Sequence, residues 1–329
     1  MNNNILSVVF SFKNEEDNLP ELIRRTRSVL TEECKKGKIT DYELLFVNDA
    51  STDGSLEILL EELEKQKDIK IINMSRTFGI SPCVLAGLKY AIGDGIVYLD
   101  ADLQDAPELI AEMIDVWRTR NVDVVHTVRL SRKGETKVKV WITKLGYFIL
   151  SRTSEIAIIP NAGDFKLLSR RVVNQLIGMK EKKPFMRGLT QWVGFKQERL
   201  YYHREGRFSG RSKFLVLGSA VIRNFLESAV ISFSEMPLYL ISLLGISIAV
   251  SAFLLMIYVI IGKYIGINVP GYTGIMATVL LLGGIQLVSL GVIGLYIGSI
   301  YLETKGRPNY IVESKYGFDE EPARMKRDK

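Results

Sequence analysis

Two long stretches without a charged residue constrain this chain more than any other feature of its sequence. They run from Pro237 to Gly262 and from Gly271 to Leu302. Each is longer than the roughly 20 apolar residues that a helix needs to cross a lipid bilayer. The sequence therefore predicts a two-helix transmembrane domain over residues 236–303, preceded by amphipathic juxtamembrane helices over residues 213–235.

Residues 1–212 have a different pattern, in which short apolar strands alternate with amphipathic helices. This alternation predicts an α/β domain with a mostly parallel, Rossmann-like sheet and helices on both faces. The expected strands cover residues 5–10, 42–47, 69–74, 95–99 and 122–128, and the expected helices cover residues 19–30, 55–65, 81–91 and 107–118. In such sheets ligands bind beyond the carboxyl ends of the strands.

Charged and polar residues follow four of the expected strands: Glu15 after the first, Asp49 after the second, Asp100 and Asp102 after the fourth, and Arg129 after the fifth. Two carboxylates held side by side repel each other unless a cation or a proton lies between them. Oxygen ligands of this kind suit Mg²⁺ or Mn²⁺. Alternatively, the two aspartates only cap a turn and the following helix, but the neighbouring polar strand ends favour a ligand site.

Composition and short motifs exclude several other classes. The chain has neither a G-x-G-x-x-G after the first strand nor a G-x-x-x-x-G-K-[ST] segment, so the dinucleotide and P-loop fingerprints are absent. With only Cys34 and Cys83, we expect no disulfide framework. The net charge of +6 favours an anionic membrane surface over nucleic acid in a chain with two predicted spans.

Several segments between about Leu6 and Val312 resemble the polyisoprenyl-phosphate glycosyltransferases, a group of the family 2 glycosyltransferases with a GT-A fold. The resemblance rests on "FSFKNEEDNLPELI", "LLFVNDASTDGS", "MSRTFGISPCVLAGLKYAIGD", "YLDADLQDAPELI", "NAGDFKLLSRRVV", "RFSGRSKF" and, after the apolar stretches, "GLYIGSIYLETKGRPNYIV". The two-span tail most resembles that of the bactoprenol glucosyltransferases.

The resemblance implies an inverting, metal-dependent membrane glycosyltransferase. It would move a hexose from a nucleotide-sugar, with UDP-glucose as the favoured donor, to undecaprenyl or another polyprenyl phosphate. The product would be a lipid-phosphate sugar donor for modification of cell-envelope glycans, and the cofactor would be Mg²⁺ or Mn²⁺.

The resemblance also assigns roles on the donor side. Ser11, Lys13 and Glu15 stand where the family opens its nucleotide pocket, and Asp49 stands at the nucleobase end. Ser11 and Lys13 replace the family's usual proline and aromatic residue, which puts the base contacts at those two positions in doubt.

Further roles concern the diphosphate, the metal and the acceptor. Asp100 would face the donor, Asp102 and Gln104 would hold the metal, and Arg129 would reach the donor and acceptor phosphates. Asp102 and Asp164 are the candidate catalytic carboxylates. Arg207 and Lys213 match a basic loop that closes on the diphosphate.

The role of Asp164 stays open between a general base and an orienting group. A lipid monophosphate is already largely anionic near neutral pH, because a phosphate has a second pKa of about 6. Such a nucleophile needs little proton abstraction, which favours the orienting role.

Charge asymmetry predicts the orientation in the membrane. The loop from Lys263 to Pro270 carries one lysine, whereas the tail over residues 304–329 is rich in lysine and arginine. By the positive-inside rule, the catalytic domain and this tail face the cytoplasm, which makes the chain a multi-pass protein of the inner (cytoplasmic) membrane. Glycines in the second span favour self-association into a homo-oligomer.

Three rival readings use the same features. A processive polysaccharide synthase would share the fold, but Gln191 and Trp192 lack the arginine of its Q-x-x-R-W motif. A non-catalytic membrane scaffold would be expected to lose the acidic cluster, which is intact. A nucleotidyltransferase gives no reason for the membrane segments.

Overall fold

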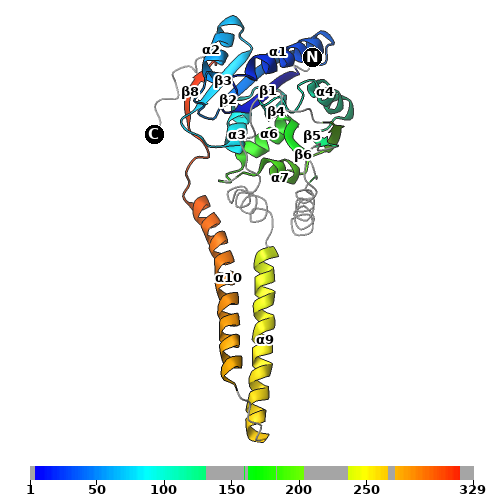
Figure 1. Ribbon diagram of the computed structural model, residues 1–329. Coiled ribbons are helices and arrows are strands. Elements are labelled where there is room, and N and C mark those ends of the chain that lie inside the picture. Colours follow the sequence, from blue (N-terminus) through cyan, green and yellow to red (C-terminus); the bar gives the residue numbers. More distant parts are fainter. Residues whose placement is uncertain are drawn as a thin grey trace, which may run out of the picture. The chain divides into compact units, whose positions relative to one another are not determined.

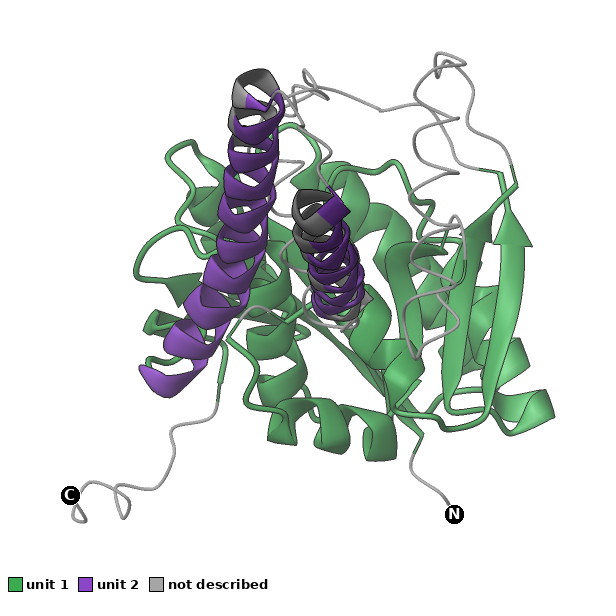
Figure 2. Ribbon diagram, turned by 90° about the horizontal axis from the view of Figure 1, so that it is seen from below, with its two compact units in different colours: residues 1–147, 156–216, 307–329 green, residues 148–155, 217–306 purple. Residues whose placement is uncertain are grey.

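The computed structural model describes residues 4–130, 159, 162–182, 184–203, 236–265 and 271–318. The chain divides into two compact units, shown in different colours in Figure 2. Unit 1 comprises residues 1–147, 156–216 and 307–329, and unit 2 comprises residues 148–155 and 217–306. The juxtamembrane helices expected over residues 213–235 lie outside the described residues.

Unit 1 contains eight described strands, arranged in a single sheet (Figure 1). The strands are β1 (Ile5–Phe12), β2 (Asp41–Asn48), β3 (Ile69–Met74), β4 (Gly95–Asp100), β5 (Val124–Arg129), β6 (Ala162–Ser169), β7 (Gln197–Tyr202) and β8 (Val312–Tyr316). The described helices of unit 1 are α1 (Leu19–Lys35), α2 (Ser55–Lys65), α3 (Ile80–Tyr90), α4 (Leu109–Arg120), α6 (Arg170–Gly178) and α7 (Met186–Trp192).

The sheet has the order β7-β5-β6-β4-β1-β2-β3-β8 and is mostly parallel, as the sequence predicts. β4, β1, β2 and β3 run parallel to one another, and β5 runs parallel to β7. β6 is antiparallel to both β4 and β5, and β8 is antiparallel to β3. The structure therefore adds three strands, β6, β7 and β8, to the five expected from the sequence.

Alternating side chains of β1 pack against helices on the two faces of the sheet. Leu6, Val8 and Phe10 belong to one large buried cluster with residues of α1 and α4. The ring of Phe10 stacks on that of Phe46, with centroids 4.7 Å apart. Because successive residues of a strand point to opposite faces, Val9 lies on the other face, where α3 packs on β1 and β2.

A glycine lets α3 approach the sheet closely. A Cβ added at Gly87 would lie 2.2 Å from Cγ1 of Val9 and 3.3 Å from Cγ2 of Val47. Both valines are fully buried, and a β-branched side chain in a strand has few alternative rotamers. Any side chain at position 87 must therefore push α3 away from the strands.

We expect Gly87→Ala to lower the free energy of unfolding by about 1–3 kcal/mol, because overpacking forces the helix off the sheet. Gly178→Ala is the matched control, since Gly178 also lies in a helix and a Cβ there would meet nothing within 4 Å. Thermal unfolding of each purified variant in detergent measures the change in its stability. A Gly87→Ala variant as stable as the control would contradict this packing.

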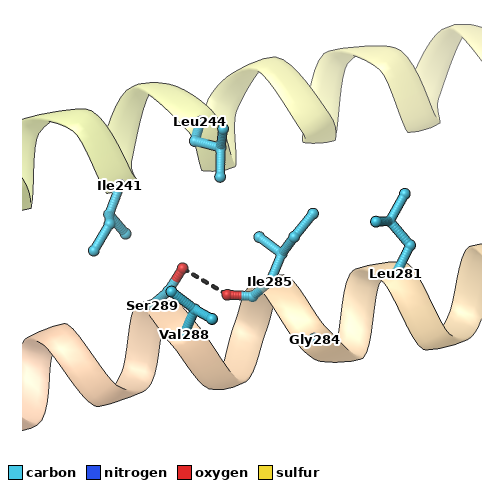
Figure 3. Close-up of a pocket in the computed structure, with 7 residues that line it drawn as sticks. All are labelled: Ile241, Leu244, Leu281, Gly284, Ile285, Val288 and Ser289. Carbon is cyan, nitrogen blue, oxygen red and sulfur yellow. Dashed lines mark hydrogen bonds between the residues drawn. The ribbon is translucent and has the colours of Figure 1, made fainter.

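Unit 2 contains helices α9 (Met236–Ile265) and α10 (Tyr272–Thr304). Among the described residues, one segment is long and apolar enough to span a membrane, Leu281–Thr304 of α10. Ile241 and Leu244 of α9 face Leu281, Ile285 and Val288 of α10 across an open apolar groove of about 390 Å³ (Figure 3). The expectation of two spans remains a prediction for α9.

The residues after α10 return to the sheet of unit 1. Residues 307–329 cluster with unit 1, and β8 pairs along β3, with Ser314 opposite Asn73. The sequence indicated only a basic cytoplasmic tail over residues 304–329. Strand β8 shows instead that part of this segment is built into the α/β domain.

Candidate active site

The carboxyl ends of the central strands bring the acidic residues together. Ser11 of β1 is paired in register with Asp100, the last residue of β4. β4 and β6 run antiparallel with Tyr98 opposite Lys166. Asp100 and Asp164 each lie two residues further toward the same edge, and therefore on the same face of the sheet. The pairing of a parallel with an antiparallel strand thus sets two carboxylates opposite each other.

The surroundings of Asp100 disfavour the ionised form of its carboxyl group. Burial raises the pKa of its carboxyl to about 7, and the charges of Asp164, Asp102 and Asp105 act in the same direction. The hydroxyl of Ser11 donates a hydrogen bond to Asp100 Oδ1 at 3.3 Å. A cation placed beside Asp100 would restore its ionised form, so this corner of the site attracts positive charge.

The raised pKa of Asp100 makes the free energy of unfolding depend on pH. Between about pH 4 and pH 7 the folded protein keeps a proton on Asp100 that the unfolded chain has released, so wild-type stability falls as pH rises through this range. Asp100→Asn removes this dependence. We expect the variant to gain on the order of 4 kcal/mol relative to wild type between pH 4 and pH 7, with no further change above.

Thermal melts of both proteins at pH 4 to 8 in EDTA measure this difference. Melting temperatures that stay parallel across the range would show that Asp100 ionises as an ordinary surface aspartate does.

Asp164, the candidate catalytic carboxylate, is held by an arginine of α7. Arg187 Nε donates to both carboxylate oxygens of Asp164, at 2.9 and 3.0 Å, and Arg187 Nη2 also bonds Oδ2. Burial alone would raise the pKa of Asp164, but the charge and hydrogen bonds of Arg187, helped by Lys166 and Arg129, hold it below its ordinary value. The carboxylate is therefore ionised and a weak base.

A buried lysine lies two residues along β6 from Asp164. Lys166 follows Asp164 by two residues on β6, is fully buried, and donates to Thr190 Oγ1 of α7 at 2.5 Å. Burial lowers its pKa to about 7, against the opposing effect of Asp164. The Thr190 hydroxyl in turn bonds the carbonyl of Met186 at 2.8 Å. Lys166 thus ties the helix that carries Arg187 to the strand that carries Asp164.

Arg129 is held in place by two side chains, those of Asp105 and Tyr202. Arg129 Nη2 donates to Asp105 Oδ2 at 3.1 Å, and Arg129 Nε donates to the hydroxyl of Tyr202 at 3.1 Å. Tyr202 also bonds Asp105 Oδ1. A Cβ added at Gly163 would lie 3.0 Å from the Arg129 guanidinium. The small residue before Asp164 therefore makes room for this arginine.

Asp102 and Gln104 form a tight turn after β4. Gln104 donates from its backbone and its side chain to the two oxygens of Asp102, at 3.2 and 2.7 Å. Leu103 between them has a positive φ of 53°. The described residues contain no group of three or more acidic, histidine or cysteine side chains gathered as a metal site. The Asp102 carboxylate and the Gln104 amide oxygen are hard ligands that fit Mg²⁺ or Mn²⁺, provided that substrate oxygens complete the coordination.

The expected nucleotide-side residues lie in two loops that contact each other. Glu15 N–H donates to Ser55 Oγ at 3.0 Å, and the Glu15 carboxylate accepts from Asn18 at 2.6 Å. Asp49 accepts from the backbone N–H of Phe78 at 2.6 Å and of Gly79 at 3.0 Å, which anchors the loop before α3. The nucleobase role of Asp49 stays a prediction. Arg207 and Lys213 lie outside the described residues.

Four residues of this site were missed by sequence reasoning. Asp105 belongs to the same "DADLQD" run as Asp100, but only the first two aspartates were given a role. Arg187 lies in α7, a helix that is not among those expected from the sequence. Lys166 and Tyr202 lie in strands β6 and β7, which the sequence did not indicate.

Comparison with known proteins places this site in a family. The model described as Glycosyl transferase family 2 matches residues 7–177, just over half of the chain. The chain belongs to glycosyltransferase family 2. As a member of this family it is a transferase, and its mostly parallel α/β domain is the GT-A fold that the motifs implied.

Relatives of this family 2 glycosyltransferase extend the match to nearly the whole chain. It is 42% identical over 319 residues to an uncharacterized glycosyltransferase of Synechocystis sp., covering 95% of this chain and 96% of the relative. It is 33% identical over 311 residues to the bactoprenol glucosyl transferase of Shigella phage SfX, covering 94% and 99%.

Among solved structures, one similar chain is the mannosyltransferase PcManGT from Pyrobaculum calidifontis, in complex with GDP-Man and Mn2+. It is 17% identical, with a TM-score of 0.45, covering 63% of this chain and 58% of that chain.

Proposed function

We propose that this enzyme transfers a hexose, with UDP-glucose as the favoured donor, to undecaprenyl phosphate at a membrane. The observation that carries the proposal is the pairing of Asp164 with Arg187 next to Asp100, at the edge where Asp102 and Arg129 also lie. The bactoprenol glucosyl transferase of phage SfX, which matches 94% of the chain, supports a polyprenyl-phosphate acceptor. The apolar segment Leu281–Thr304 supports a membrane location.

The donor diphosphate would lie beyond β1 and β4. Asp102 and Gln104 would hold a divalent metal, which supplies positive charge to the departing nucleoside diphosphate. Arg129, fixed by Asp105 and Tyr202, lies close enough to this edge to place a second cation near the phosphates. An arginine oriented in advance stabilises developing charge without having to reorganise during the reaction.

Transfer forms one bond and breaks one. An oxygen of the lipid phosphate attacks C1 of the sugar, and the bond between C1 and the diphosphate oxygen breaks on the opposite face, which inverts the configuration. Asp164, ionised and held by Arg187, orients the acceptor instead of taking a proton from it. The exposed part of Arg187, about 36% of its side chain, offers the acceptor phosphate a guanidinium.

The membrane arrangement is part of the same proposal. Helices α9 and α10 are proposed as two spans, with the GT-A domain and the residues after α10 in the cytoplasm, where nucleotide-sugars are made. Glycines 283, 284, 291, 294 and 298 of α10 provide surfaces for close helix packing between copies of the chain.

We expect a single cysteine placed at Asn268, between α9 and α10, to be labelled from outside intact cells by an impermeant thiol reagent. A cysteine at Lys326 should stay unlabelled until the membrane is opened. The background is a chain whose Cys34 and Cys83 have been replaced by serine or alanine. Labelling of position 326 in sealed cells would overturn the proposed orientation.

The activity test uses the purified full chain, radiolabelled UDP-glucose and undecaprenyl phosphate. The proposal expects label to move into a butanol-extractable lipid with one sugar per phosphate. GDP-mannose and UDP-N-acetylglucosamine serve as competing donors. Label appearing only in long water-soluble polymer would favour a processive synthase, and no transfer from any nucleotide-sugar would contradict the proposed function.

A further inference from the structure

A series of hydrogen bonds connects β8, which follows α10 in the sequence, with the loop after β1. Glu313 Oε2 accepts from Asn73 Nδ2 at 2.8 Å, and Asn73 Oδ1 accepts from Asn48 Nδ2 at 2.9 Å. Asn48 Oδ1 accepts from the backbone N–H of Ser51 at 2.9 Å. Ser51 Oγ accepts from the backbone N–H of Asn14 at 2.9 Å. The four bonds cross β3 and β2 at the strand ends.

The loops joined by this series have unusual backbones. Asn14 and Ala50 have φ values of 54° and 53°, in the left-handed region that alanine in particular avoids. Asn14 also locks the two loops together, since its Oδ1 accepts from Thr52 N–H at 2.8 Å. Such a conformation persists only where surrounding contacts hold it.

A second contact from the same segment reaches the loop before α3. Ser75 N–H donates to the carbonyl of Ile311 at 3.1 Å. Ser75 begins the loop that ends at Phe78 and Gly79, whose N–H groups bind the Asp49 carboxylate. Ile311 therefore contacts the loop that binds the Asp49 carboxylate, while Glu313 ends the series that reaches the loops after β2 and β1.

We propose that Glu313 is a positioning residue of the donor site, which keeps the loops after β1 and β2 in the form that binds a nucleoside diphosphate. This inference rests on the proposed function and assigns a part of the donor site to a residue that lies beyond the apolar helices in the sequence. Glu313 touches no reacting atom and acts through Asn73 and Asn48.

The chemistry of the series explains why a carboxylate stands at its end. Asn48 is almost fully buried, so its amide must be paired on both sides. Each amide accepts from the loop side and donates toward β8, so the dipoles point the same way and strengthen one another. An ionised carboxylate is the strongest acceptor for the last N–H.

The test compares nucleotide binding by Glu313→Ala and Glu313→Gln in the purified full chain. The probes are UDP and GDP with Mg²⁺, and whichever binds wild type is used. We expect Glu313→Ala to raise Kd and the donor KM about three- to tenfold, which corresponds to the net contribution of one ordinary hydrogen bond. Glu313→Gln keeps an acceptor oxygen and should stay within about twofold of wild type.

The controls separate positioning from a general loss of structure or charge. Glu64→Ala removes an exposed glutamate of α2 and should leave Kd unchanged. The kcat of Glu313→Ala at saturating donor should stay within about twofold of wild type. An unchanged Kd in Glu313→Ala, or an equal loss in Glu313→Gln, overturns the inference while the proposed function stands. Wild type that binds neither UDP nor GDP overturns both.

Discussion

Asp102→Asn is expected to reduce turnover by on the order of 10²-fold or more while the fold stays intact. Replacing the carboxylate by an amide removes one negative charge from the proposed metal site, and with it the stabilisation of the departing diphosphate. The hydrogen bonds that Asp102 makes with Gln104 are local to one turn. Asparagine has nearly the same shape as aspartate, so we expect the thermal midpoint to move little.

The measurement is kcat at saturating donor and acceptor over a series of Mg²⁺ and Mn²⁺ concentrations. Wild type should lose activity in EDTA and regain it with either metal, and Asp102→Asn should need more metal for any residual rate. Glu64→Gln is the control for the loss of an exposed carboxylate. Near wild-type turnover in Asp102→Asn with either metal would remove Asp102 from the proposed metal site.

The sequence predicted several strands and helices that carry this site, because these elements follow from local patterns of apolar and polar residues. The apolar run before Asp100 is β4, and the expected strand over residues 69–74 coincides with β3. α1 extends to Lys35, five residues beyond the expected end, because the polar residues after Leu30 continue the helix without a breaker. Boundaries of this kind depend on solvent-exposed residues that carry little hydrophobic signal.

The partners of the site residues depend on contacts distant in sequence, which no local pattern shows. Lys166 would be read as a surface lysine, yet it is fully buried because α7 covers it. β8 pairs with β3 across more than 200 residues of chain. Arg187 meets Asp164 only because β6 inserts between β4 and β5. In each case the residue or strand can be found in the sequence, but its partner cannot.

Asp164→Asn is expected to reduce kcat by roughly 10²- to 10³-fold and to keep a residual rate that rises with pH. Arg187 holds the Asp164 carboxylate with three hydrogen bonds and keeps its pKa below the ordinary value. Such a group is a poor proton acceptor, so its contribution is to orient and stabilise charge, an effect of this size when one oriented polar group is lost. The amide keeps the shape but loses the charge that binds Arg187.

The pH dependence decides between the two roles. If Asp164 orients the acceptor, the residual activity of Asp164→Asn should increase as pH passes about 6, where the lipid phosphate takes its second charge. If Asp164 is an obligatory base, the variant should be inactive at every pH. The experiment is a pH-rate profile from about pH 5 to 9 at saturating lipid phosphate and constant metal, with Arg187→Lys as the companion that keeps a cation beside Asp164. A variant that binds both substrates yet is inactive from about pH 6 to 9 would contradict the orienting role and establish Asp164 as the base.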